Sequence, residues 1–107
     1  MSNHEIAQAV ADLADFLDSY GISFWPEHLR RELDGLRMGD EQASRNLVAY
    51  FGGMRNLDDL IITPANGHSV SEAEGESATR EMRRHFEELL QAGLPIRRNW
   101  PIGQTDD

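Results

Sequence analysis

A chain of 107 residues has room for one domain, and a domain of this size folds without disulfides or a structural metal. The absence of cysteine excludes disulfide bonds, thiolate catalysis and cysteine-ligated zinc. Nineteen acidic and ten basic residues give a formal net charge of −9, which repels the phosphates of nucleic acids and attracts basic proteins, although an ordinary solvated surface carries such charge too.

We expect one globular domain over residues 1–103 and a disordered tail over residues 104–107. The first residues carry neither a basic start nor a long apolar run, so the sequence predicts no signal peptide. No window approaches the roughly 18 apolar residues that cross a membrane. These features favour a cytoplasmic protein with no membrane partner, and the lack of cysteine fits a reducing compartment.

The first predicted helix is amphipathic and ends at Gly21. Ser2 and Glu5 have the spacing of a capping box at its start. Apolar residues then recur every three or four positions, as expected for one buried helical face: Ile6, Val10, Leu13, Leu17 and Tyr20.

The second and third predicted helices are separated at Gly39. Pro26 is tolerated in the first turn of the second helix, because its missing N–H has no intrahelical partner there. Charged residues of this helix, Glu32 among them, are expected to lie largely outside its buried face, and His28 is interpreted as a surface histidine. Asp40 is a good N-cap for the third helix. The apolar faces of these two helices are predicted to contain Trp25, Leu29, Leu33, Leu36, Ala43, Leu47 and Phe51, with Tyr50 at the margin.

Residues 47–63 form the most apolar stretch of the chain and contain the adjacent glycines Gly52 and Gly53. Helical spacing before Gly52 gives way to a β-branched run after Leu60, over residues 61–63, which favours an extended chain. We therefore predict that one of the two glycines ends the third helix with a backbone geometry that other residues tolerate poorly.

Residues 64–71 are predicted to form either a small β-hairpin or an ordinary loop. Asn66-Gly67 is a hairpin signal, because both residues accept positive φ. The arm that follows it is short and polar, and two strands without a sheet are only marginally stable.

The fourth predicted helix begins with a second capping box, Ser71 with Glu74, and ends at Gly93. Gly75 is expected to weaken its first turns. Trp100, in the irregular segment beyond, is expected to anchor that segment to the domain. The sequence thus predicts a mainly α fold with four antiparallel helices, and with either a small β-hairpin or a loop between the third and the fourth.

We find no residue pattern typical of catalysis, and we predict no catalytic residues, no metal and no cofactor. The chain contains no lysine, and its four histidines are scattered without the spacing of a zinc site. Arginines of the fourth helix have acidic partners four residues away, such as Glu76 for Arg80. Arg97-Arg98 is the one pair of basic residues without an acidic residue at such a spacing.

Asp58 and Asp59 are the acidic pair beside the apolar stretch. Such a pair either caps a turn or contacts an arginine or lysine of a partner. Trp25 and Tyr50 are residue types that dominate interface hot spots. We therefore predict Trp25, Tyr50, Asp58 and Asp59 as partner-binding residues.

The segment Phe51-Gly52-Gly53-Met54, followed by Asn56-Leu57-Asp58-Asp59-Leu60-Ile61-Ile62, resembles a family of small bacterial domains of unassigned function. Its members are similar in having an amphipathic helical first half and a Phe-Gly-Gly-Met segment before a short Asp-Leu-Ile/Val run. The resemblance covers residues 13–90, departs from the pattern at Arg55, and implies no catalytic residues. Small acidic members of this family look like the immunity proteins encoded beside bacterial secreted toxins.

This resemblance and the charge of −9 favour a cytoplasmic immunity protein, which binds a basic toxin or effector and occludes its active surface. One alternative is a small regulatory or adaptor protein that forms a homodimer. Another is a small metal-dependent hydrolase built from scattered carboxylates and histidines. The sequence leaves the oligomeric state open.

Overall fold

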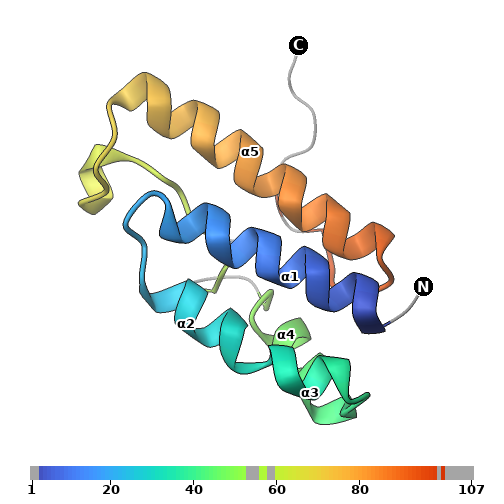
Figure 1. Cartoon of the computed structure of the whole chain (residues 1–107). Helices are drawn as coiled ribbons and strands as arrows, with labels where there is room; N and C mark the ends of the chain where they lie inside the picture. The colour runs from blue at the N-terminus through green and yellow to red at the C-terminus, as the bar shows by residue number, and fades with distance from the viewer. Residues whose placement is uncertain (1–2, 53–55, 58–59, 99, 101–107) are drawn as a thin grey trace.

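The computed structural model describes residues 3–52, 56–57, 60–98 and 100, and these residues form a mainly helical domain (Figure 1). The elements in chain order are α1 (Asn3–Asp18), α2 (Phe24–Arg31), α3 (Leu33–Arg37), α4 (Glu41–Ala49), the 3₁₀ helix η2 (Pro64–Asn66) and α5 (Glu72–Gln91). No helix within these ranges is both long enough and apolar enough to cross a membrane.

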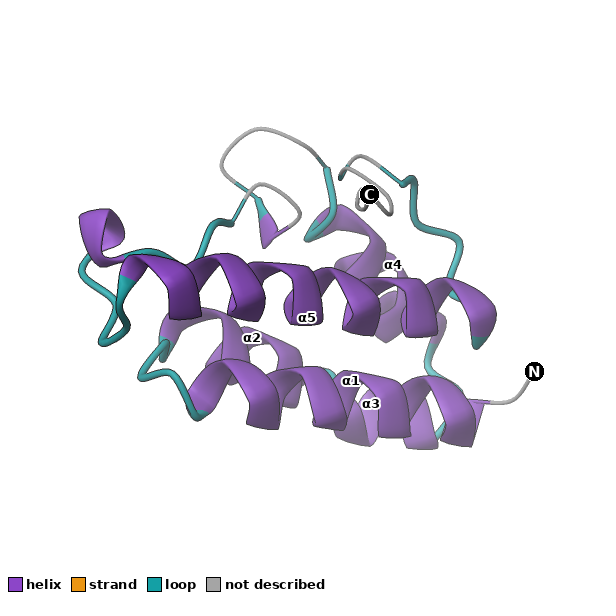
Figure 2. Ribbon diagram, turned by 90° about the horizontal axis from the view of Figure 1, so that it is seen from above, coloured by secondary structure: helices purple, strands orange, loops and turns teal. Residues whose placement is uncertain are grey.

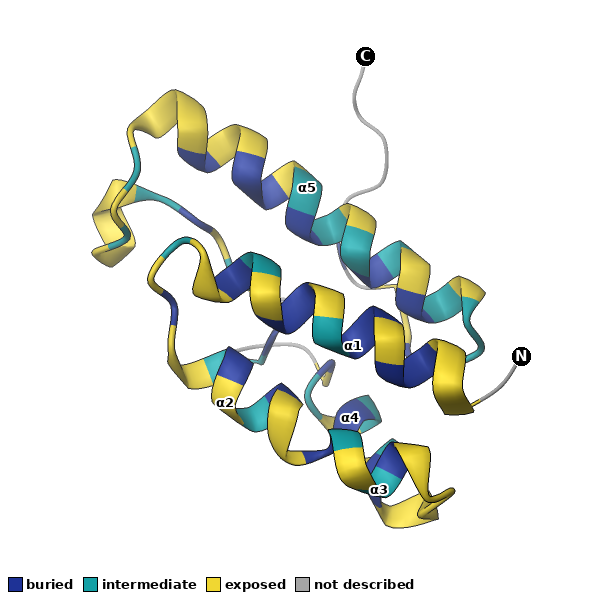
Figure 3. Ribbon diagram, viewed as in Figure 1, coloured by how far each residue is buried: buried dark blue, intermediate teal, exposed yellow. Residues whose placement is uncertain are grey.

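The long helix α1 lies between α5 on one side and α2 with α3 on the other (Figure 1). It runs antiparallel to both α2 and α5, and the view turned by 90° again places α1 and α5 side by side (Figure 2). The predicted apolar face of α1 is confirmed, since Val10, Leu13 and Leu17 are fully buried. Buried positions on α5 likewise follow the face toward α1, and its outer face is exposed (Figure 3).

The predicted second helix is interrupted at Glu32, which separates α2 from α3. The N–H of Glu32 donates to the carbonyl of Leu29 at 3.1 Å, a bond of the tighter 3₁₀ type. The expectation that Glu32 lies outside the buried face is wrong, because only 8% of the residue is exposed. After α3, Asp40 caps α4 as predicted, its side chain accepting from the N–H of Gln42.

The third predicted helix, α4, ends at Ala49, before the glycine pair. Gly52 is not among the glycines with positive φ, so a left-handed geometry is not found at this one of the two candidate glycines. Gly53 lies outside the described residues. Among the described glycines, those with positive φ are Gly21, Gly39, Gly67 and Gly93, three of which follow helices where the sequence predicts an end.

The segment around Asn66-Gly67 is a loop containing η2, and the β-hairpin is not formed. Thr63 caps η2, its hydroxyl accepting from the N–H of Ala65 at 3.4 Å. No residue of the described ranges is in a β-strand. The physical reason is that the backbone groups of Ile62 bond to a side chain and are not available to pair with a second strand. The Ile62 N–H donates to the hydroxyl of Thr79 at 2.9 Å, and the Ile62 carbonyl accepts from that hydroxyl at 3.3 Å.

The capping box at the start of α5 is confirmed. The N–H of Glu74 donates to the Ser71 hydroxyl at 3.1 Å, and the N–H of Ser71 donates to the Glu74 carboxylate at 2.9 Å. The helix begins at Glu72 and continues through Gly75, so the glycine does not delay its start. Gly75 has a packing role instead, because a Cβ atom there would lie 2.4 Å from the carbonyl oxygen of Ile62.

Trp100 anchors the segment after α5, as the sequence predicts. It is 4% exposed, and its ring centroid lies 5.1 Å from that of Phe86. The indole N–H donates to the Glu87 carboxylate at 2.9 Å. Arg98, expected to lack a companion, forms two hydrogen bonds of 2.6 Å to the same carboxylate. The predicted tail over residues 104–107 lies outside the described residues.

Candidate functional site

Four rings gather on the surface where the start of α2 meets the end of α4. We call this set the aromatic surface, and it consists of Phe24, Trp25, His28 and Tyr50. The ring centroids of Trp25 and Tyr50 lie 5.6 Å apart, and those of Phe24 and His28 lie 4.1 Å apart. The distance between Trp25 and Tyr50 is ordinary for interacting rings, and Phe24 and His28 are packed more closely. Phe24 is nevertheless 57% exposed, so the cluster presents an open apolar face.

The local sequence of α2 explains why Phe24 and His28 lie on its outer side. Pro26 and Leu29 are buried and fix the inner side of the helix. Phe24 and His28 are four residues apart, so they lie one above the other on the same helical face. The Nδ1–H of His28 donates to the carbonyl oxygen of Phe24 at 2.8 Å, which orients the imidazole within the cluster.

Tyr50 is held in place by a buried carboxylate. Its hydroxyl donates to Oε2 of Glu32 at 2.9 Å, and the amide of Asn46 donates to Oε1 at 3.2 Å. Burial, and then the hydrogen bond to Glu32, raise the pKa of Tyr50 to about 12. The carboxylate therefore has two donors, and the phenol ring has one preferred orientation.

Of the four predicted partner-binding residues, the structure brings together Trp25 and Tyr50. Asp58 and Asp59 lie outside the described residues, so their prediction stands without a structural statement. Sequence reasoning missed Phe24 as a site residue and treated His28 as an ordinary surface histidine. Their spacing of four residues on one helix was the available signal.

The aromatic surface has the chemistry of a binding site. Rings of this kind offer apolar area, and their faces attract the side chains of arginine and lysine. Within the described residues, no three histidine, aspartate or glutamate side chains gather closely enough to hold a metal ion. Comparison with protein-family models, curated proteins and solved structures finds no match for the chain.

The titration of Tyr50 tests this geometry. An unfolded tyrosine loses its proton near pH 10 and the folded Tyr50 near pH 12, so the stability contributed by this proton is complete below about pH 10 and declines as the pH rises toward 12. We expect a decline of about 1 kcal/mol, discounted because the side chain is only half-buried. Urea unfolding at several pH values between these limits measures it.

The control for this titration is Tyr20→Phe, which leaves Tyr50 as the one tyrosine. Absorbance of the tyrosinate in this variant should rise only near pH 12. A midpoint at the ordinary value of about 10 would contradict the bond between Tyr50 and Glu32.

Proposed function

We propose that this chain is an immunity protein that binds a basic secreted toxin through the aromatic surface and occludes the toxin's active surface. The observation that carries the proposal is the half-open cluster of Trp25, Tyr50, Phe24 and His28 in a chain of net charge −9. The resemblance proposed from residues 51–62 adds an analogy only: small acidic members of that family look like immunity proteins, and no family model matches the chain.

The energetic argument begins with the aromatic anchors. Tryptophan and tyrosine carry much of the binding energy in protein interfaces, because each buries a large area at a small cost in side-chain entropy. That cost is smaller still for Tyr50, since its hydroxyl is already bonded to Glu32 before any partner arrives. Burial of the exposed Phe24 ring adds an apolar contribution.

The negative net charge of the chain favours basic partners over other proteins. A net charge of −9 attracts a basic surface and accelerates its association, and this effect weakens as salt screens it. Arginine or lysine side chains of the toxin fit the ring faces of the cluster. Asp58 and Asp59 are proposed to add direct ionic contacts to the same side chains.

The proposal is tested by measuring binding to the toxin encoded by the neighbouring gene. Trp25→Ala should weaken binding by about 2 kcal/mol or more, with the association rate falling as salt is raised. Met38→Ala is the matched control, because Met38 is 84% exposed and lies outside the aromatic surface. The proposal fails if no partner is captured at low salt, or if the two variants bind equally well.

A homodimeric adaptor is the second candidate, and the exposure of Phe24, Met38 and Ile61 favours it. A dimer interface that covers any of these side chains would remove apolar area from water. Light scattering of the isolated chain separates the two proposals. A monomer supports a foreign partner, whereas a dimer that Phe24→Ser dissociates supports the adaptor.

A further inference from the structure

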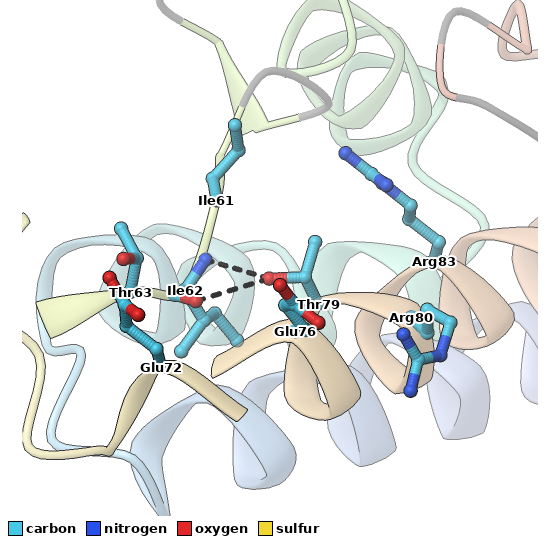
Figure 4. A pocket seen from close by; sticks show the side chains of 8 residues that line it. All are labelled: Ile61, Ile62, Thr63, Glu72, Glu76, Thr79, Arg80 and Arg83. Atoms are coloured by element: carbon cyan, nitrogen blue, oxygen red, sulfur yellow. Dashed lines mark hydrogen bonds between the residues drawn. The ribbon is translucent and has the colours of Figure 1, made fainter. Parts of the chain in front are cut away.

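A groove of about 450 Å³ lies between α5 and the extended run over residues 60–63 (Figure 4). Its volume is in the range of small-molecule sites. Gly75 and Thr79 bring the two walls together, one by lacking a side chain and the other through its bonds to Ile62. The lining residues are Ile61, Ile62, Thr63, Glu72, Glu76, Thr79, Arg80 and Arg83.

Charge is divided along this groove. Glu72 and Glu76 line it on the first turns of α5, and Arg80 and Arg83 line it on the following turns. The ion pair that the sequence predicts between Glu76 and Arg80 is absent from the ion pairs of the described residues. The groove therefore has an acidic end and a basic end that do not neutralise each other.

Arg83 is the unusual member of this set. Its Nε atom is buried and has no hydrogen-bond partner in the described structure, and desolvation lowers the pKa of the guanidinium. The side chain extends toward Ile61, whereas Arg80 turns away from it (Figure 4). An anion in the groove cannot reach the buried Nε atom, but it can pair with the part of the guanidinium that faces the groove and so offset the desolvation of this half-buried cation.

We propose that this groove binds a carboxylate carried on an aliphatic body. The planar guanidinium of Arg83 matches a carboxylate with two parallel hydrogen bonds. Ile61 is 50% exposed and offers the adjoining apolar contact. Glu72 and Glu76 disfavour a more highly charged anion such as phosphate. The ligand is either a free aliphatic acid or the carboxyl terminus of a peptide, and this site is independent of the aromatic surface.

The test is an NMR titration of the full chain with hexanoate, with hexanol as a neutral probe of equal chain length. Hexanoate should shift the amide signals of Ile61, Thr79 and Arg83, and hexanol should not. Arg83→Gln should weaken hexanoate binding roughly tenfold or more, which is the loss expected for a charge-assisted hydrogen bond. Arg97→Gln is the matched control for charge, because Arg97 is exposed and does not line the groove.

A second pair of probes distinguishes the two sources of carboxylate. Acetyl-Ala-Leu with a free carboxyl terminus binds more tightly than hexanoate if the ligand is a peptide terminus, and less tightly if it is a free acid. The carboxamide of the same peptide should not bind. Thermal melts of both arginine variants verify that they fold.

Ile61→Ser tests the apolar half of the site independently of Arg83. It should weaken hexanoate binding while leaving the weaker binding of acetate unchanged. Equal shifts with hexanoate and hexanol, no shift with either, or equal effects of Arg83→Gln and Arg97→Gln would each overturn the proposal.

Discussion

Replacing Gly75 by alanine should lower the free energy of unfolding by about 2 kcal/mol. The added Cβ would lie 2.4 Å from the carbonyl oxygen of Ile62 and 3.2 Å from the Cα of Thr63. Alanine gains about 1 kcal/mol of helix propensity over glycine, but this gain is smaller than the cost of displacing a packed backbone. Urea unfolding of Gly75→Ala measures the balance.

The backbone of Ile62 cannot move freely to relieve this contact. Its N–H and its carbonyl are both bonded to the hydroxyl of Thr79, one turn further along α5. Ile62 itself is 1% exposed, so a shift also disturbs the core.

Ser77→Ala is the matched control for Gly75→Ala, because Ser77 is exposed on the same helix. This control should change stability by no more than about 0.5 kcal/mol. A Gly75→Ala variant as stable as the parent protein would show that the contact between Gly75 and Ile62 does not constrain the fold.

Features that depend on neighbouring residues were predictable from the sequence. The capping box of Ser71 with Glu74 joins residues three apart, and the Asp40 cap joins residues two apart. The apolar face of α1 follows from helical periodicity alone. Because caps and helical periodicity involve only neighbouring residues, they are enough to predict where helices begin, which faces are buried and that the fold is mainly helical.

Features that depend on distant residues were not predictable. From its sequence neighbours alone, Gly75 is expected to weaken its helix, because the segment that packs against it is distant in the sequence. Sequence periodicity places Glu32 outside the buried face for the same reason, since its partner Tyr50 is 18 residues away. The pair of Arg98 with Glu87 spans 11 residues, beyond the helical spacings that sequence inspection considers.

The candidate site shows both cases within one cluster. Residue type alone identified Trp25 and Tyr50 as interface anchors. Their contact depends on the start of α2 lying beside the end of α4, and no local pattern in the sequence encodes that arrangement. Phe24 and His28 join the cluster through the same packing, although their shared helical face was readable from the sequence.

Trp100→Ala should have the largest effect on stability, a loss of about 3–5 kcal/mol. The side chain is 4% exposed and packs against Phe86 and Phe51, with ring centroids 5.1 and 6.2 Å away. Truncation leaves a cavity among these rings and removes the indole donor of Glu87. Thermal and urea unfolding measure the loss.

Arg98→Gln separates the packing of Trp100 from the ion pair beside it. Arg98 contacts the same carboxylate, but its side chain is 42% exposed, so its loss should destabilise the protein much less than the loss of Trp100. Trp100→Phe keeps most of the ring packing and loses the indole N–H, so its stability should fall between that of the parent protein and that of Trp100→Ala.

If Trp100→Ala and Arg98→Gln are equally stable, the segment after α5 is held by charge and the tryptophan does not anchor it. If Trp100→Ala alone is strongly destabilised, the core extends beyond the last helix, and residues 94–100 are needed for folding rather than forming a dispensable end.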